Sequence, residues 1–416
     1  MKVSPVPIGA SGGVRGLPPR EHTADPGAFG PAGPGPSMLS SPAGPSAPCP
    51  PTTVDDQLAY GFRTLSDLEE SASRRVLDHV WAYIQGGSGD ERTLAANLAA
   101  FRRRSLRPRV LVDATSIDLS TTVLGRRTRA PFFVAPTAYQ GMVHPEGEVA
   151  VARAARDAGL LGAFSTLSSR SLEEIAAASG DGVRWFQLYL QPDFGVSKSL
   201  VERAERAGYA AIVLTADVPV LGSRDRQARG GFAIDASVPV GNGADVVPPS
   251  RAPLLQGEEY RLRSDAGSTW EVLDQLREAT RLPIVVKGIL TGADARRAVD
   301  HGARGIVVSN HGGRQLDGSP AALDALAEVV ASVGGATEVY LDGGVRRGSD
   351  VLMALAMGAR AVGLGRPVLW ALAAGGGAGV AHYFSLLGVE LATSMALAGR
   401  TNLADVDASL LGPALP

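Results

Sequence analysis

The sequence has a single cysteine, Cys49, among its 416 residues. One cysteine excludes an intramolecular disulfide framework and any zinc or iron–sulfur site built on cysteine ligands, and we predict no metal site. The 40 basic and 42 acidic side chains leave a formal net charge of -2, so the chain lacks the basic excess that nucleic acid or an anionic membrane surface would attract. No apolar run approaches the ~18 residues that a spanning helix needs. We therefore expect neither a nucleic-acid partner nor a membrane partner.

Glycine and proline are not scarce, but they are unevenly distributed. Residues 1–51 hold 13 of the 28 prolines and 9 of the 51 glycines. A segment of this composition buries too little apolar surface to offset its chain entropy, and it lacks the basic start and apolar stretch of a secretory signal. We predict a disordered tail over residues 1–53, within which Met38 offers an alternative start, and one folded domain over residues 54–416. The absence of a signal and of a cysteine network favours the cytoplasm.

The rest of the chain alternates short apolar runs with amphipathic patterns. Helical patterns over about 65–83 and 93–104 come first. Eight runs rich in branched and aromatic residues follow, at 132–135, 163–167, 185–189, 211–215, 283–287, 306–309, 339–342 and 361–364. Apolar strands alternating with helices indicate parallel strands buried on both faces. Eight such units over roughly 250 residues predict an α/β fold, a (β/α)₈ TIM barrel with an N-terminal helical extension.

An open doubly wound sheet is the alternative fold, but no glycine fingerprint follows the first strand. The connection over residues 222–269, after the fourth strand, is unusually long. Long loops of this kind are usually functional, often as lids over a site.

Polar residues cluster where the predicted strands end, on the face of a TIM barrel that carries active sites. Gln187 and Tyr189 alternate along the third run and hence share one face. The other strand-end positions are Pro136, Thr137, Ala138, Ser168, Thr215, Asp217, Lys287, Ser309, His311 and Arg314.

Glycine turns followed by arginine end the last two strands, at 342–346 and 365–366. Such turns expose backbone N–H groups beside a cation, and phosphate sites of TIM barrels commonly lie there. We predict a phosphate site formed by Gly343, Gly344, Arg346, Gly365 and Arg366. The alternative is that these glycines only close tight turns.

Lys287 and His311 are the candidates for chemistry. A lysine that ends an apolar strand needs an anionic partner or a lowered pKa, so Lys287 could form a Schiff base, lie beside an electron-rich cofactor ring or form a structural salt bridge. His311 is suited to accept a proton if Asp217 holds its tautomer, and Arg314 could bind a carboxylate. These residues suggest an acid with a removable proton and leave aldolase and oxidoreductase both open.

Residues 309–317, with the sequence SNHGGRQLD, closely resemble the active-site signature of the FMN-dependent α-hydroxy acid oxidases and dehydrogenases, a family that includes glycolate oxidase, lactate oxidase and mandelate dehydrogenase. Matches at 135–138, 144–148, 166–169, 186–189, 287–288, 342–348 and 365–367 extend the resemblance over about residues 55–402. The resemblance implies an FMN-binding barrel domain. The cofactor contacts that it implies are Pro136, Thr137, Ala138, Ser168, Gln187, Thr215, Lys287, Ser309, Asp342, Gly343, Gly344, Arg346, Gly365 and Arg366.

The resemblance also implies the reaction, in which an (S)-2-hydroxy acid becomes a 2-oxo acid while His311, paired with Asp217, takes a proton. A hydride route and a carbanion route would use the same residues. The implied substrate contacts are Tyr83 and Arg314 for the carboxylate, Tyr189 for the hydroxyl, and Arg224. O₂ is the expected acceptor and hydrogen peroxide the by-product, with a dehydrogenase of the same family as the alternative. The resemblance further implies a homotetramer.

Details at 138–140 (AYQ), 166–169 (TLSS) and 230–233 (GGFA) look closest to the hydroxymandelate oxidases, which makes an aryl 2-hydroxy acid the leading substrate. Arg170 departs from the bulky apolar residue of glycolate-oxidase-like members. It could contact a second anionic group of the substrate, point to solvent or pair with Glu173. The alternatives are therefore lactate, another aliphatic or acidic 2-hydroxy acid, a flavin-binding protein without this activity, and more distantly a lysine-dependent barrel aldolase.

Overall fold

The computed structural model describes residues 62–235, 237–246, 248 and 267–414, together with the backbone of 254–256 and 259–261. The predicted tail over 1–53, with Cys49, lies outside the described residues, as does the predicted start of the domain at residue 54.

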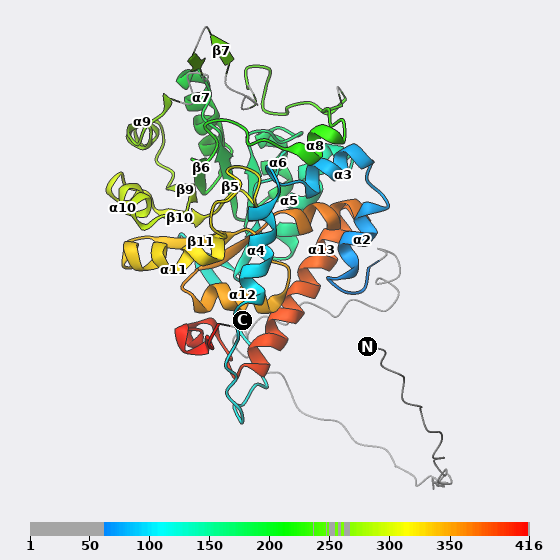
Figure 1. Cartoon of the computed structure of the whole chain (residues 1–416), viewed down its shortest axis with the longest axis vertical. Coiled ribbons are helices and arrows are strands. Elements are labelled where there is room, and N and C mark those ends of the chain that lie inside the picture. Colours follow the sequence, from blue (N-terminus) through cyan, green and yellow to red (C-terminus); the bar gives the residue numbers. More distant parts are fainter. Residues whose placement is uncertain are drawn as a thin grey trace, which may run out of the picture. The chain divides into compact units, whose positions relative to one another are not determined.

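Eight parallel strands close into a barrel in the order β10-β11-β12-β3-β4-β5-β6-β9 (Figure 1). Their bounds are β3 Phe132–Val134, β4 Gly162–Ser165, β5 Arg184–Leu188, β6 Ala211–Thr215, β9 Ile284–Ile289, β10 Gly305–Val308, β11 Glu338–Asp342 and β12 Ala361–Leu364. All eight correspond to the predicted apolar runs, and nearly every residue in them is buried. The predicted TIM barrel is confirmed.

Helices surround the barrel, as Figure 1 shows. They are α5 Gly147–Asp157, α6 Leu172–Ser179, α7 Phe194–Arg206, α9 Glu271–Ala279, α10 Gly292–Asp300, α11 Ala322–Val333, α12 Gly348–Ala356 and α13 Arg366–Leu397. Shorter elements are the hairpins β1 Thr121–Val123 with β2 Arg126–Thr128 and β7 Leu254–Gln256 with β8 Glu259–Arg261, and the 3₁₀ turns η1 Gln140–Met142, η3 Leu403–Asp405 and η4 Ala408–Leu410.

The N-terminal extension consists of α2 Asp67–Ser73, α3 Asp78–Gln85 and α4 Arg92–Arg102. The single helix predicted over about 65–83 was wrong, because the chain turns between α2 and α3. Leu77 has an extended backbone (φ -60°, ψ 142°), which is the conformation of a residue that precedes a new helix. The turn aims α3 at the barrel mouth and carries Tyr83 there.

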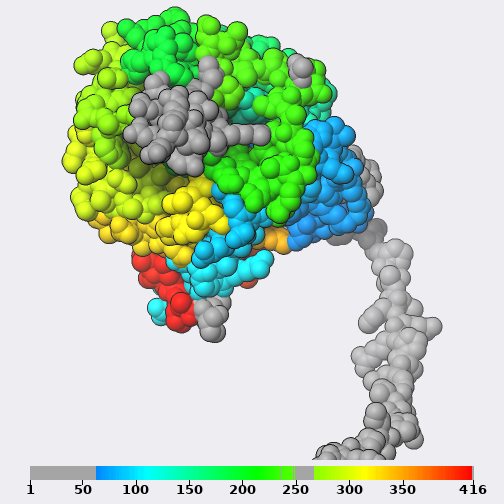
Figure 2. All heavy atoms as spheres, turned by 45° about the horizontal axis from the view of Figure 1, so that its top comes forward, coloured from blue at the N-terminus to red at the C-terminus, as the bar shows by residue number. Residues whose placement is uncertain are grey.

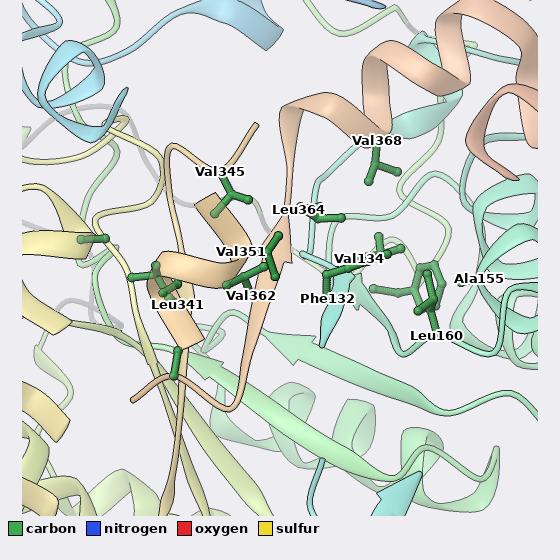
Figure 3. Packing of buried hydrophobic residues seen from close by; sticks show 14 of the residues in the cluster. Phe132, Val134, Ala155, Leu160, Leu341, Val345, Val351, Val362, Leu364 and Val368 are labelled. Atoms are coloured by element: carbon green, nitrogen blue, oxygen red, sulfur yellow. The ribbon is translucent and has the colours of Figure 1, made fainter. Parts of the chain in front are cut away.

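Aromatic side chains fill the inside of the barrel below its mouth. Trp185 and Tyr340 meet edge to face at 5.3 Å, and Phe133 packs against both. The outer faces of the same strands pack against the helices; in Figure 3, Phe132, Val134 and Leu364 face Ala155 of α5 and Val368 of α13. This plugged interior leaves the C-terminal strand ends as the place for a ligand.

Helix α13 is long and apolar enough to cross a membrane by length and composition, so the expectation that no such segment exists was wrong. Counting consecutive apolar residues missed it, because glycine and serine interrupt the run without adding charge. The helix bends at Gly375 and Gly376, which have non-helical backbones. It packs against α5, α12 and α2, and Leu387 and Leu391 are fully buried.

The long connection after β6 carries α8, Asp225–Arg229, and the β7–β8 hairpin. Helix α8 packs against α3, and Figure 2 shows this green segment beside the blue N-terminal helices. The backbone N–H of Gly241 donates to the carbonyl oxygen of Ser168 at 2.8 Å, which ties the loop to the end of β4. The described part of the loop therefore borders the barrel mouth.

Candidate active site

A cavity of about 260 Å³ lies at the C-terminal ends of the strands. Its wall includes residues from β9, β11 and β12, from the segment after β3, from α3 and from the long loop. The predicted site residues in its wall are Tyr83, Pro136, Thr137, Ala138, Tyr189, Arg224, Lys287, His311, Arg314, Asp342, Gly343, Gly344, Arg346, Gly365 and Arg366. The fold thus brings together residues that are up to 283 positions apart in the sequence.

His311 lines this cavity and pairs with Asp217, which lies behind it. The imidazole Nδ1 lies 3.1 Å from Asp217 Oδ1, and Nε2 lies 3.4 Å from the hydroxyl of Tyr189. His311 has a left-handed backbone (φ 59°), a strained conformation that is often found at functional sites. Its backbone N–H donates to Ser309 Oγ at 3.0 Å, which helps to hold that conformation.

Burial and nearby charges adjust both members of the pair. Burial lowers the pKa of His311, the Lys287 charge acts in the same direction, and Asp217 opposes them only in part. Burial alone would raise the pKa of Asp217, but the charges of His311 and Lys287 outweigh it and hold this pKa below its usual value. The result is an ionised Asp217 behind a neutral imidazole. With the imidazole proton on Nδ1, facing Asp217, Nε2 carries no proton and can accept one.

Lys287 is the centre of a second buried network. Its Nζ donates to Ser309 Oγ at 3.1 Å and lies 3.6 Å from Asp342 Oδ2, while Ser309 Oγ donates to Asp342 Oδ1 at 2.5 Å. Burial opposes the charge of Lys287, but Asp342 and Asp217 raise its pKa above the usual value. A Schiff base requires a neutral amine, so this network argues against the aldolase alternative.

Two half-buried arginines, Arg346 and Arg366, also line the cavity. In the part of the chain that the structure describes, neither forms an ion pair with a carboxylate. Arg366 donates to the carbonyl oxygens of Ile84, Gly312 and Gly86 at 2.9–3.0 Å. Burial lowers the pKa of both arginines, and for Arg366 the neighbouring arginine charges lower it further. Buried cations without an acidic partner predict an anionic ligand.

The turn after β11 lines the cavity and also packs closely on α4. Gly343 and Gly344 have φ values of 99° and 89°, which side chains rarely adopt. A Cβ on Gly344 would meet the carbonyl oxygen of Asn97 at 2.4 Å. This turn therefore requires glycine, and with Arg346 and Arg366 it fits the phosphate of a cofactor such as FMN.

Arg314, Tyr83 and Phe232 form a stack beside His311. The guanidinium of Arg314 lies 4.8 Å from the centre of the Tyr83 ring, and the Phe232 ring stacks on the Tyr83 ring at a centroid distance of 4.5 Å. Arg314 Nη1 donates to the carbonyl oxygens of Tyr83 and Gly86. Arg224 Nε lies 3.5 Å from the carbonyl oxygen of Arg314, so the two arginines predicted to contact substrate lie together, and the charge of Arg224 acts on His311.

Four predicted cofactor residues do not line the cavity, and their side chains form hydrogen bonds behind its wall. They are Ser168, Gln187, Thr215 and Ser309. Gln187 Nε2 donates to Thr215 Oγ1 at 2.8 Å. Ser168 Oγ donates to the carbonyl oxygen of Ser165 at 2.8 Å, and Ser309 bridges Lys287 and Asp342. These side chains position the residues that do line the wall.

Arg170 is the predicted substrate residue that the structure places elsewhere. Its Nη2 donates to the carbonyl oxygen of Pro145 at 2.7 Å, and its Nη1 lies 3.9 Å from Glu174. The expected alternative partner, Glu173, pairs with Arg203 instead. Ser171 begins α6 with a capping box, and this turn directs Arg170 away from the cavity.

Several residues of the wall were not among the predicted site residues. They are Ile84, Tyr139, Leu167, Leu221, Gln227, Phe232, Ile234 and Leu369. Phe232 was noted only as part of the GGFA motif, although an aromatic residue in a polar loop is a signal for burial against a site. Leu221, Gln227 and Ile234 lie on the long connection after β6, whose path local patterns do not encode. Ile84, Tyr139, Leu167 and Leu369 come from α3, from the segments after β3 and β4, and from α13.

Comparison with known proteins identifies the family. The family model described as FMN-dependent dehydrogenase matches residues 72–413. The chain is 48% identical over 355 residues to an L-lactate oxidase of Nostoc sp. (83% of this chain, 97% of the relative) and 49% identical over 340 residues to a 4-hydroxymandelate oxidase of Amycolatopsis orientalis (81% and 95%). A crystal structure of mandelate oxidase with benzoyl-formic acid superposes with a TM-score of 0.76 at 48% identity (84% and 97%). The resemblance predicted from the signature around His311 is confirmed, and the chain belongs to the FMN-dependent dehydrogenase family.

Proposed function

We propose that the chain is an FMN-dependent oxidase that converts an (S)-2-hydroxy acid into the 2-oxo acid. The observation that carries the proposal is one cavity with two sets of groups. The first set is a neutral His311, with the ionised Asp217 behind it, together with Tyr189 and Arg314. The second set is Lys287, Arg346, Arg366 and the turn at Gly343 and Gly344, which fit FMN.

FMN, when bound, supplies the site that accepts the two electrons of the oxidation. Arg346, Arg366 and the turn at Gly343 and Gly344 would hold its phosphate, and Lys287 would provide the cation for the electron-rich ring. Since the charges of Asp342 and Asp217 outweigh the burial of Lys287 and keep it protonated, this cation is present throughout the working pH range.

The residues of the chain handle the carboxylate and the proton. Arg314 binds the substrate carboxylate through its guanidinium. His311 Nε2 accepts one proton, from the hydroxyl if hydride leaves the α-carbon or from the α-carbon itself in the carbanion route. Asp217 stabilises the imidazolium that results. Tyr189, whose hydroxyl lies 3.4 Å from Nε2, orients the substrate hydroxyl between them.

The cavity favours a substrate with an apolar far end. Beyond His311, the wall is formed by Leu167, Leu221, Phe232 and Ile234 with Tyr139. Because Arg170 points away from the cavity, it cannot bind the second carboxylate of a dicarboxylate substrate. Relatives named for hydroxymandelate and mandelate agree with an aryl group, and we propose an aryl 2-hydroxy acid as the substrate. Lactate is the second candidate, because a lactate oxidase is 48% identical to this chain.

The test is the ratio of kcat/KM values for (S)-mandelate, (S)-lactate and (S)-malate, measured by peroxide formation. Mandelate should be the best substrate and malate the worst. A higher kcat/KM for malate than for mandelate would contradict the claim that the cavity favours a substrate with an apolar far end.

We further propose O₂ as the electron acceptor, since each curated relative named above is an oxidase. O₂ would take up two electrons and two protons and leave as hydrogen peroxide.

We propose a homotetramer by analogy with the family, which sedimentation would test. A cytoplasmic location is proposed because a chain with one cysteine suits a reducing compartment, and cell fractionation would test it.

A further inference from the structure

Two buried polar atoms in the cavity wall have no hydrogen-bond partner among the described residues. They are the hydroxyl oxygen of Tyr139 and the side-chain oxygen Oε1 of Gln227. Unpaired buried polar groups are costly and rare in native proteins. A pair of them on one ligand cavity indicates that a ligand supplies the missing partners.

Tyr139 is held rigidly at the substrate half of the cavity. It follows the cofactor-facing turn after β3, and its left-handed backbone (φ 55°) is fixed by an N–H bond to the carbonyl oxygen of Leu167 at 3.0 Å. Only 5% of the residue is exposed. Burial raises the pKa of its phenol, and the proximity of Tyr83 and Tyr189 raises it further. Tyr139 is therefore a neutral hydroxyl, close to two predicted substrate residues.

Gln227 brings an amide to the same cavity from the loop. It is buried while its neighbours Arg226 and Ala228 on α8 are exposed, so its side chain points inward. Its backbone carbonyl oxygen accepts from the N–H of Phe232 at 3.2 Å. This bond couples Gln227 to the aromatic ring that stacks on Tyr83.

The charges of the cavity exclude an ionic partner for these two groups. Lys287 is paired with Asp342, Arg314 and Arg366 both donate to the carbonyl oxygen of Gly86, and Arg224 Nε lies 3.5 Å from the carbonyl oxygen of Arg314. Tyr139 and Gln227 thus offer a neutral donor and a neutral acceptor, next to the apolar side chains of Leu167 and Phe232 in the same wall. A phenol hydroxyl both accepts and donates one hydrogen bond, and it matches this combination.

We propose that Tyr139 and Gln227 form a polar subsite that selects aryl 2-hydroxy acids bearing a hydroxyl on the ring. The inference rests on the proposed function and refines it. Tyr139 donates to the ring hydroxyl, and that hydroxyl donates to Gln227 Oε1. Neither residue takes part in proton transfer, so they set specificity and not the rate of chemistry.

The test compares the holoenzyme with Tyr139→Phe and Gln227→Leu. Tyr383→Phe is the matched control, because its hydroxyl is also buried and without a partner among the described residues but lies on α13 outside the cavity. One readout is the kcat/KM ratio of 2-, 3- or 4-hydroxymandelate to mandelate. The other readout is the ratio of Kd values for the matching hydroxyphenylacetate and for phenylacetate. Both compounds lack the α-hydroxyl and are not oxidised, and their binding is measured by the perturbation of the flavin spectrum.

Wild type and Tyr383→Phe should prefer at least one ring-hydroxylated isomer by about tenfold in both ratios, and each subsite variant should reduce this preference about tenfold. Preferences in the subsite variants within twofold of wild type would overturn the subsite while leaving the oxidase intact. Loss of FMN in place of selectivity would also overturn it, since the groups would then serve the cofactor. Oxidation of lactate but of no mandelate would contradict both the subsite and the aryl substrate.

Discussion

Replacing Asp217 by asparagine tests the role of the buried pair most sharply. The change keeps the shape of the side chain but removes its charge and puts an N–H₂ group within reach of His311 Nδ1. If that amide donates, Nδ1 must accept, and the imidazole proton moves to Nε2. The nitrogen that should take the substrate proton would then already carry one.

The magnitude follows from the geometry. At the observed Nδ1–Oδ1 separation of 3.1 Å and an effective dielectric constant of about 20, a carboxylate stabilises an imidazolium by about 5 kcal/mol. That energy corresponds to a ceiling of about 10⁴-fold in rate. Since the proton is only partly transferred at the transition state, we expect kcat/KM to fall by about 10³-fold while FMN stays bound.

The assay is anaerobic flavin reduction by (S)-mandelate, with FMN content measured on the same sample. The control is Asp274→Asn, because Asp274 holds His301 Nδ1 at 2.9 Å outside the cavity. This control should react at the wild-type rate. A loss below tenfold in Asp217→Asn, or an equal loss in both variants, would refute the assignment of His311 and Asp217 as the base pair.

Three further predictions concern pH, cofactor and stability. Burial lowers the pKa of His311 and the base acts unprotonated, so kcat/KM should be lost only as pH falls below about 6.5; an acid limb centred above that pH would contradict this. Arg366→Ala removes a buried cation and should weaken FMN binding at least about tenfold, measured by FMN release on dilution; unchanged affinity would remove Arg366 from the phosphate site. Phe133→Ala opens a cavity inside the barrel and should cost about 4 kcal/mol of unfolding free energy in urea, and a cost below about 1 kcal/mol would show that the interior is loosely packed.

The barrel was predictable because its signals are local. Each strand is buried on both faces, so it reads as an apolar run whatever its neighbours are. The polar strand ends then had to meet, because parallel strands end on one side of a barrel. For this reason His311 and Asp217, 94 positions apart, could be paired before their distance was known.

The misjudged features depend on tertiary placement. The direction of Arg170 is set by the cap of α6 and by a carbonyl oxygen 25 positions away, neither of which its neighbours specify. Gln227 reaches the cavity from α8 on the long loop and Tyr139 from the turn after β3, and neither position follows from the neighbouring residues. Helix α13 was missed as a long apolar helix, because residues such as Gly375 and Gly376, where it bends, interrupt the run of apolar residues.

The central claim is that this cavity oxidises an (S)-2-hydroxy acid on bound FMN with His311 as the base. The direct measurement is the visible absorbance of the purified protein, mixed without oxygen with (S)-mandelate and separately with (R)-mandelate. We predict a yellow protein that bleaches with the S enantiomer only, and a His311→Ala variant that is equally yellow but does not bleach. A colourless protein, or a yellow one that no 2-hydroxy acid bleaches, would contradict the account.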